Sequence, residues 1–171
     1  PQQVSLVNAI VAVRKPTVAV VSMGRPPGLA AVIDTLPAVL TAYYGGPHQG
    51  LAIAEAIFGF TNPGGKLPVT LPRHVGQVPI HHGQHNGSGY QRNKADIHKG
   101  YLDIPSTPLF PFGHGLSYTT FEFGPLNLAS NSVDVDGELR ATLTIRNSGK
   151  WRGTEVVQLY ARQLSPREPR P

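Results

Sequence analysis

The chain has 171 residues and 40% of them are hydrophobic, enough for one medium or two small domains with a real core. Its net charge of +5 comes from scattered basic residues that form no run or stripe, which argues against a nucleic-acid-binding protein. The absence of cysteine excludes disulfides and thiolate metal sites, and no apolar run is long enough for a membrane span, so we expect no membrane partner.

The first part of the chain alternates helical and strand patterns. Residues 3–14 place apolar side chains near one helical face, and 17–22 and 38–43 are continuous β-branched and apolar runs typical of buried parallel strands. Residues 29–35 predict a helical turn, and 50–58 predict a second helix. This order predicts right-handed crossovers and a mainly parallel sheet with helices on its faces, the α/β fold class.

The middle of the chain, 59–116, is irregular and rich in Pro, Gly, His and Asn. Only 66–71 has the pattern of a strand, which we expect at the edge of the same sheet. A segment this long without regular structure is either functional or braced by a neighbour that these residues do not include.

Short alternating strands follow residue 121. They are predicted at 132–135, 139–145 and 156–160, with turns at 136–137 and 147–149. This is the pattern of an all-β sandwich, but such a domain needs about seven strands in roughly 100 residues. The sandwich is therefore predicted to be truncated, and the missing initiator Met and Pro-rich end lead us to expect a fragment.

Five motifs together carry a resemblance to a known family. They occur in the family's order and cover most of the chain: VVSMGRP at 20–26, YYGGPHQG at 43–50, NPGGKLPVT at 62–70, PLFPFGHGLSYTTF at 108–121 and GTEVVQLY at 153–160. With these motifs the chain resembles glycoside hydrolase family 3, the β-glucosidase and β-xylosidase group.

The resemblance implies an organisation and an activity. It implies the C-terminal part of an α/β sandwich domain at 1–107, an interdomain linker at 108–121 and a truncated fibronectin type III-like sandwich of the immunoglobulin class at 122–171. It also implies a retaining glycosidase, without a cofactor, that removes terminal β-linked glucose or xylose from oligosaccharides or glycosides.

The catalytic groups that the resemblance implies are expected outside these residues. Retaining hydrolysis needs two carboxyl groups roughly 5 Å apart. In the family an Asp nucleophile lies on an N-terminal barrel domain, which would be supplied in cis or in trans, and an acid/base Glu lies on a loop expected upstream of Pro1. We therefore assign no catalytic residue among the ten acids of this chain, and expect the isolated chain to be inactive. Asp96 and Asp103 are better suited to contact substrate than to catalyse.

A polar loop at 81–101 mixes hydrogen-bonding and stacking side chains suited to sugars. Tyr90 and Arg92 are its leading candidates for substrate contacts, against the alternative of a merely exposed loop. A metal site formed by its histidines His81, His82 and His85 is disfavoured, because their spacing fits no helix face and no acidic ligand adjoins them.

His48 is a departure from the family pattern, since related enzymes commonly carry Glu there. It lies at a strand-to-helix turn, where it either contacts substrate or caps the following helix. We predict no metal site.

Two functions of other kinds stay open at the level of sequence. Gly45-Gly46-x-x-x-Gly50 before a helix is weak evidence for a non-catalytic anion- or nucleotide-binding module, and it lacks the Lys-Ser/Thr of a phosphate-binding loop. The other alternative is a carbohydrate-binding module that has lost catalysis.

Overall fold

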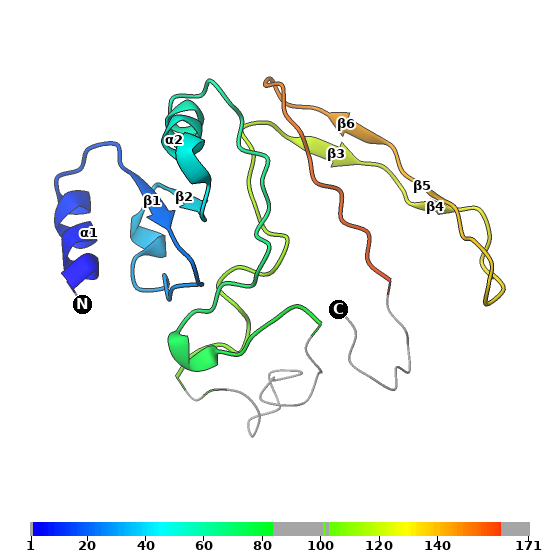
Figure 1. The fold of residues 1–171 in the computed structure, drawn as a ribbon, viewed down its shortest axis with the longest axis horizontal. Coiled ribbons are helices and arrows are strands. Elements are labelled where there is room, and N and C mark those ends of the chain that lie inside the picture. Colours follow the sequence, from blue (N-terminus) through cyan, green and yellow to red (C-terminus); the bar gives the residue numbers. More distant parts are fainter. Residues whose placement is uncertain (1, 84–100, 102, 162–171) are drawn as a thin grey trace.

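The computed structural model describes residues 2–83, 101 and 103–161. The N-terminal half alternates helices and strands in the predicted order (Figure 1). Its elements are α1 (Gln2–Ala12), β1 (Val18–Ser22), η1 (Ile33–Thr35), β2 (Ala38–Ala42), η2 (Gly46–His48), α2 (Gln49–Ile57) and η3 (Val75–Gln77). The local patterns were strong enough here to predict α1, β1, η1, β2 and α2, whereas the short helix η2 was not expected.

The two predicted strands form a parallel pair. Their register runs from Val18 opposite Ala38 to Ser22 opposite Ala42, and the Met23 N–H extends it with a 2.9 Å hydrogen bond to the Ala42 carbonyl. Alternate residues of β1 are exposed, so one side of this pair is poorly covered within the described chain. A continuous apolar run is typical of a strand that is packed on both faces of its sheet. The described residues pack against only part of these faces.

The core is small and lies where Leu67 and Leu71 pack against the residues at the end of β1. Met23, Leu67 and Leu71 are buried in it, and Val21, Leu29, Tyr43 and Phe110 pack around them. Burial raises the pKa of the Tyr43 hydroxyl, whose oxygen has no hydrogen-bond partner among the described residues.

The prediction that 66–71 adds a strand to the edge of the parallel sheet is wrong. This segment pairs instead with 109–114: the Leu67 N–H donates to the His114 carbonyl and the Leu71 N–H to the Phe110 carbonyl, each at 2.8 Å. Only an isolated antiparallel bridge between Leu71 and Phe110 results. Pro68 and Pro72 alternate with the donating residues Leu67 and Leu71, and the fixed φ of proline is poorly suited to a regular strand.

Gln77 joins two segments that are far apart in sequence. Its side chain is 2% exposed; its Oε1 accepts from the Arg73 N–H at 2.6 Å, and its Nε2 donates to the Pro105 carbonyl at 2.9 Å. Gln77→Leu keeps the volume but leaves these backbone groups unpaired, so we expect a loss of about 2 kcal/mol in the free energy of unfolding, measured with urea. The matched change at the exposed Gln3 should alter it by less than about 0.5 kcal/mol. Equal effects of the two changes would contradict this role for Gln77.

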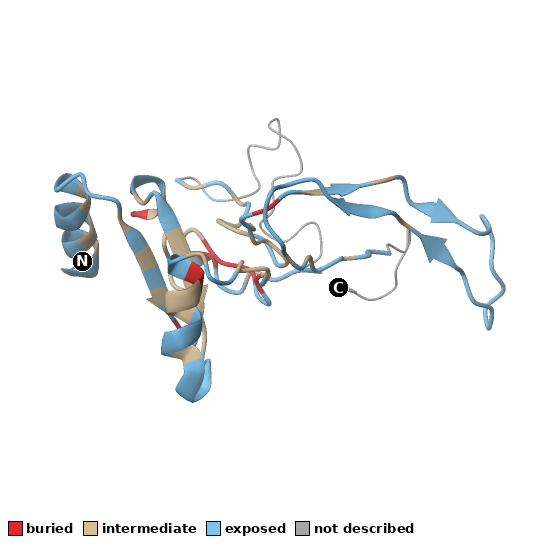
Figure 2. Ribbon diagram, turned by 90° about the horizontal axis from the view of Figure 1, so that it is seen from above, coloured by how far each residue is buried: buried red, intermediate tan, exposed pale blue. Residues whose placement is uncertain are grey.

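The C-terminal region forms a long antiparallel ribbon that projects from the rest of the molecule (Figure 1). Its strands are β3 (Phe121–Phe123), β4 (Asn127–Leu128), β5 (Ala141–Thr142) and β6 (Ile145–Asn147), with β3 paired to β6 and β4 to β5. No residue in 121–161 is buried, as Figure 2 shows by the blue of the ribbon.

Three strand predictions in this region need correction. Residues 132–135 and 156–160 are not strands, and 139–145 is divided between β5 and the start of β6. A second layer to bury one face of the ribbon is absent from 121–161, so the two packed sheets expected of a sandwich are not seen there. The described chain is thus a mixed α/β structure with small sheets. None of its described helices has both the length and the apolar character needed to cross a membrane.

Candidate functional site

The carboxyl ends of β1 and β2 lie side by side because the strands are parallel, and this is the edge where α/β proteins bind ligands. Gly24 and Arg25 follow β1, and Tyr44 follows β2. The Tyr44 ring lies so close to Gly24 that a Cβ there would stand 2.7 Å from the ring carbon Cζ. Glycine at position 24 is therefore what allows the Tyr44 ring to occupy its place.

The turn between β2 and α2 is stabilised by a side chain. Gly46 has φ of +69°, a conformation that favours glycine, and the Gly45 N–H donates to Gln49 Oε1 at 3.0 Å. The Gln49 carboxamide thus occupies a backbone N–H that an anion would need. The glycine pattern at 45–50 builds a capped turn, which weakens the argument for a nucleotide or anion site.

His48 stands at this edge with its side chain exposed. It ends η2 directly before α2, and its side chain makes no capping hydrogen bond. The helix-capping alternative for His48 is therefore wrong, since the hydrogen bond that fixes the turn comes from its neighbour Gln49. The imidazole is left available for a ligand at the same edge as Tyr44.

The other predicted contacts are divided between described and undescribed parts of the chain. Tyr90, Arg92, Asp96 and His85 lie outside the described residues, whereas Asp103 is described and exposed. Within the described residues no three His, Cys, Asp or Glu side chains converge in a way that could hold a metal ion.

His82 contacts two aromatic rings. Its ring centroid lies 5.1 Å from that of Phe112, with the planes 28° apart, and 5.2 Å from that of Tyr160. These contacts connect the beginning of the 81–101 segment to residues 108–121 and to the C-terminal segment. Sequence reasoning missed this role, because nothing in the local pattern around His82 identifies rings that lie 30 or more residues away.

An ion pair joins the two halves of the chain. Lys66 Nζ lies 2.8 Å from Glu155 Oε1, with the two side chains 13% and 14% exposed, and it also donates to the Gly115 carbonyl at 2.8 Å. Nearby, Gln158 Nε2 donates to the Gly113 carbonyl at 2.9 Å. Burial lowers the pKa of His114, and the positive charge of Lys66 lowers it further. Glu155 therefore has a structural partner.

Asn62 binds the linker on one side and the C-terminal segment on the other. Its Oδ1 accepts from the Ser117 hydroxyl at 3.0 Å and the Tyr118 N–H at 2.9 Å, and its Nδ2 donates to the Arg152 carbonyl at 3.3 Å. Gly64 approaches Thr154 closely enough that a Cβ would stand 2.6 Å from the Thr154 carbonyl oxygen. The motifs at 62–70, 108–121 and 153–160 thus meet in space, and we call these contacts the joint.

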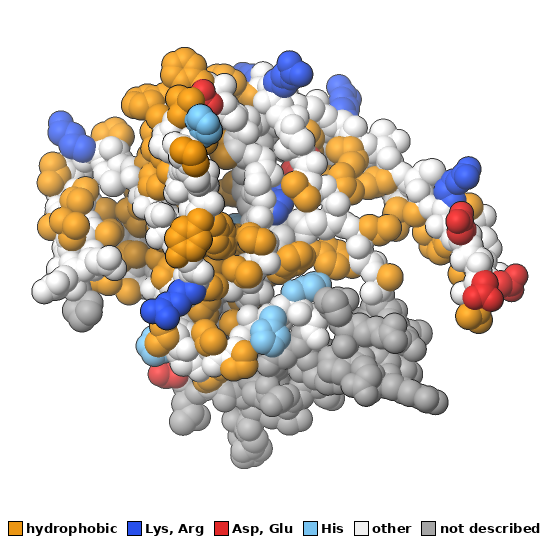
Figure 3. Space-filling view, viewed as in Figure 1, with side chains coloured by type: hydrophobic (Ala, Val, Ile, Leu, Met, Phe, Trp, Pro, Cys, Tyr) orange, Lys and Arg blue, Asp and Glu red, His pale blue; other side chains and the backbone are white. Residues whose placement is uncertain are grey.

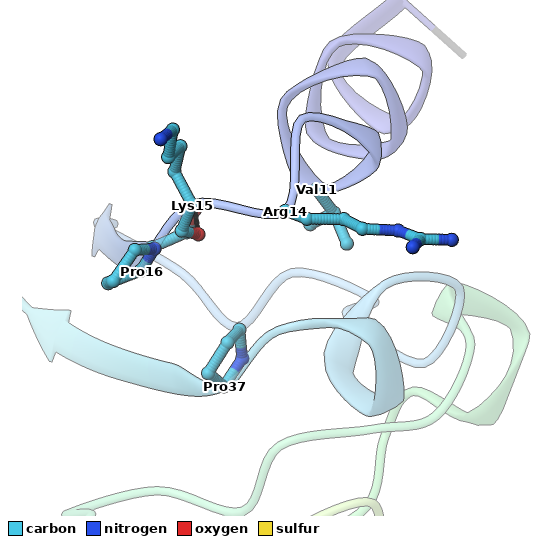
Figure 4. Close-up of a pocket in the computed structure, with 6 residues that line it drawn as sticks. Val11, Arg14, Lys15, Pro16 and Pro37 are labelled. Carbon is cyan, nitrogen blue, oxygen red and sulfur yellow. Dashed lines mark hydrogen bonds between the residues drawn. The ribbon is translucent and has the colours of Figure 1, made fainter.

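An open depression of about 350 Å³ lies at the opposite edge of the sheet. Thr17 and Pro37, which directly precede β1 and β2, belong to its lining, together with Val11, Arg14, Lys15 and Pro16. Figure 4 shows the Arg14 and Lys15 side chains pointing in different directions, so they do not converge on one ligand. This depression is separate from the carboxyl edge.

Comparison with known proteins supports the resemblance. The model of the glycosyl hydrolase family 3 C-terminal domain matches residues 1–118. The periplasmic β-glucosidase of Salmonella typhimurium is 38% identical over 171 residues, which cover 99% of this chain and 22% of that protein. A β-xylosidase of Formosa agariphila is 42% identical over 164 residues, or 94% of this chain and 21% of that protein.

Solved structures give the same result. A β-glucosidase from Erythrobacter marinus superposes with a TM-score of 0.73 at 41% identity over 86% of this chain and 18% of that structure. A β-glucosidase from Listeria innocua in complex with glucose gives a TM-score of 0.75 at 30% identity over 86% of this chain and 21% of that structure. The chain spans about one fifth of the length of these relatives. It belongs to glycosyl hydrolase family 3 and carries the C-terminal domain of that family.

Proposed function

We propose that this chain is the C-terminal part of a retaining β-glycosidase that removes terminal glucose or xylose from β-linked oligosaccharides or glycosides. The observation that carries the proposal is the alignment of 99% of the chain with a β-glucosidase and 94% with a β-xylosidase. The chain shapes the substrate site, while the nucleophile and the acid/base group lie in parts of the enzyme outside these residues.

Exposed apolar surface supports a large missing partner. Leu6 and Ile10 of α1 are 60% and 45% exposed, and Val13, directly after this helix, is 64% exposed. Val18 and Val20 of β1 are also exposed. Hydrophobic side chains cover much of the face of the molecule shown in Figure 3. A surface of this kind marks an interface. We assign it to the rest of the enzyme, including a barrel domain in cis or in trans.

His48 is the substrate contact that the described geometry supports best, because its side chain is exposed at the carboxyl edge and has no structural hydrogen bond to the turn. Tyr90 and Arg92 are proposed as further contacts on the polar character of their segment. No cofactor is needed, since retaining hydrolysis uses two carboxyl groups alone.

The domain boundaries are part of the same proposal. Residues 1–107 belong to the α/β sandwich domain, 108–121 form the linker and 122–171 begin the fibronectin type III-like domain. The hydrogen bonds of Asn62 and the Lys66–Glu155 ion pair support this division, because they join residues of all three segments. Further strands outside these residues would cover the ribbon formed by β3 to β6.

A segment replacement tests this function. In the Salmonella β-glucosidase, the region that aligns with this chain is exchanged for its 171 residues, and hydrolysis of aryl β-glucosides and β-xylosides is measured. We expect hydrolysis well above that of the same enzyme with the region deleted, because the exchanged segment completes the site and the host supplies both carboxyl groups. A chimera that folds and binds glucose but does not hydrolyse would favour a carbohydrate-binding module instead.

A further inference from the structure

Tyr44 is an exposed aromatic side chain at the ligand-binding edge. It follows β2 and is 86% exposed, whereas its neighbour Tyr43 packs against the core cluster of Met23, Leu67 and Leu71. The two neighbouring tyrosines after β2 therefore have opposite environments, one packed on the core and one exposed. Tyr43 stabilises the fold by packing on the core. Packing within the described residues gives no reason for an aromatic side chain as exposed as that of Tyr44.

The hydroxyl end of the Tyr44 ring lies beside the backbone that follows the neighbouring strand. A Cβ on Gly24 would stand 2.7 Å from the ring carbon Cζ, whereas the faces of this exposed ring stay open. The turn behind it is fixed by the hydrogen bond from the Gly45 N–H to Gln49 Oε1. Tyr44 therefore spans the carboxyl ends of both strands.

Polar side chains follow the same two strands as Tyr44. The residues that follow the two strands include Arg25 and His48, both exposed, and neither forms an ion pair within the described part of the chain. In the same described part, no hydrogen bond to the Tyr44 hydroxyl is found. A pyranose ring offers an apolar face of C–H groups to an aromatic ring, and its hydroxyls need donors and acceptors around the rim.

We infer that Tyr44 is a substrate-binding residue on whose ring a pyranose ring of the substrate stacks. The inference rests on the proposed glycosidase function and adds a contact that the sequence did not single out. Stacking of this kind binds the substrate without taking part in bond cleavage, so it should govern KM far more than kcat.

The test uses the chimera with the Salmonella enzyme and four variants of it. Tyr44→Ala removes the ring, Tyr44→Phe keeps the ring without the hydroxyl, and Tyr44→Leu keeps apolar bulk without an aromatic face. Phe60→Ala is the matched control, since Phe60 is 83% exposed but lies beyond the far end of α2. KM and kcat for an aryl β-glycoside are measured for each, together with the melting temperature.

We expect Tyr44→Ala to raise KM about three- to tenfold with kcat changed by less than about twofold. Tyr44→Leu should show the same rise, Tyr44→Phe should keep KM within about twofold of the parent, and Phe60→Ala should match the parent. The inference is overturned if Tyr44→Ala leaves KM unchanged, or if Tyr44→Leu restores KM and melting temperature, because the ring would then only pack against protein. An inactive parent chimera would instead count against the proposed function itself.

Discussion

Replacement of Leu71 by alanine is expected to lower the free energy of unfolding by about 3 kcal/mol. Leu71 is 0% exposed, and it connects the small core to the linker through hydrogen bonds of its N–H and carbonyl to Phe110 and Leu109. Removal of its side chain leaves a cavity beside Met23 and Leu67 that so few buried neighbours can fill only in part.

Urea unfolding of the 171-residue chain measures this loss, and Leu116→Ala is the matched control. Leu116 is 80% exposed, so its truncation should change the free energy of unfolding by less than about 0.5 kcal/mol. A loss below about 1 kcal/mol for Leu71→Ala would mean that the cluster around Leu71 is not the core of this chain.

Replacement of Glu155 by alanine is expected to lower the free energy of unfolding by about 2 kcal/mol. The change leaves the Lys66 ammonium, in a side chain only 13% exposed, without its anionic partner. Removal of one member of a mostly buried pair is harmful because the remaining charge has lost both water and its partner. Loss of the ion pair should also weaken the neighbouring contacts of the joint. The backbone amides of 109–115 should then exchange their hydrogens faster, which hydrogen exchange measures.

Two further variants distinguish the effect of losing this ion pair on stability from the effect of losing any carboxylate. Glu138→Ala removes an exposed carboxylate and should change stability by less than about 0.5 kcal/mol. The double replacement of Lys66 by Met and Glu155 by Leu leaves no unpaired charge and should be less harmful than Glu155→Ala alone. A double variant as unstable as the sum of the single changes would contradict a coupled pair.

The sequence predicted the fold well where local patterns decide it. The apolar spacing of α1 and α2 and the β-branched runs of β1 and β2 are properties of short segments, so their boundaries fall within about two residues of those expected. The parallel pairing of β1 and β2 could be predicted because a segment with a helical pattern separates them, and consecutive parallel strands need such a crossover connection.

The errors fall where a strand needs a partner that its own pattern does not specify. Residues 66–71 have strand-like composition, but the segment pairs with 109–114 instead of with the edge of the β1–β2 sheet. Residues 156–160 alternate as a strand should, yet Val156 and Val157 remain 48% and 50% exposed and enter no ladder. Alternation predicts a strand only when a neighbouring strand is present to complete it.

The candidate site was predictable in its position but only partly in its residues. The strand-to-helix turn at 45–50 was expected, and His48 is found there with its side chain exposed. Tyr44, the Lys66–Glu155 pair and the rings around His82 were not singled out, because each depends on contacts through space between distant segments. The glycines of the motifs were the sequence feature that indicated the joint, because a glycine can mark a position where another backbone segment comes close.

Hydrolysis by the isolated chain tests the central claim most directly, namely that these residues shape a sugar site without supplying its catalytic carboxyl groups. The purified 171-residue chain should release no aryl group from β-glucosides or β-xylosides above the rate in buffer, and an activated fluoro-sugar that traps glycosidase nucleophiles should leave its mass unchanged. Turnover by the isolated chain that disappears when one of its ten acids is replaced, or covalent labelling of that acid, would contradict the claim.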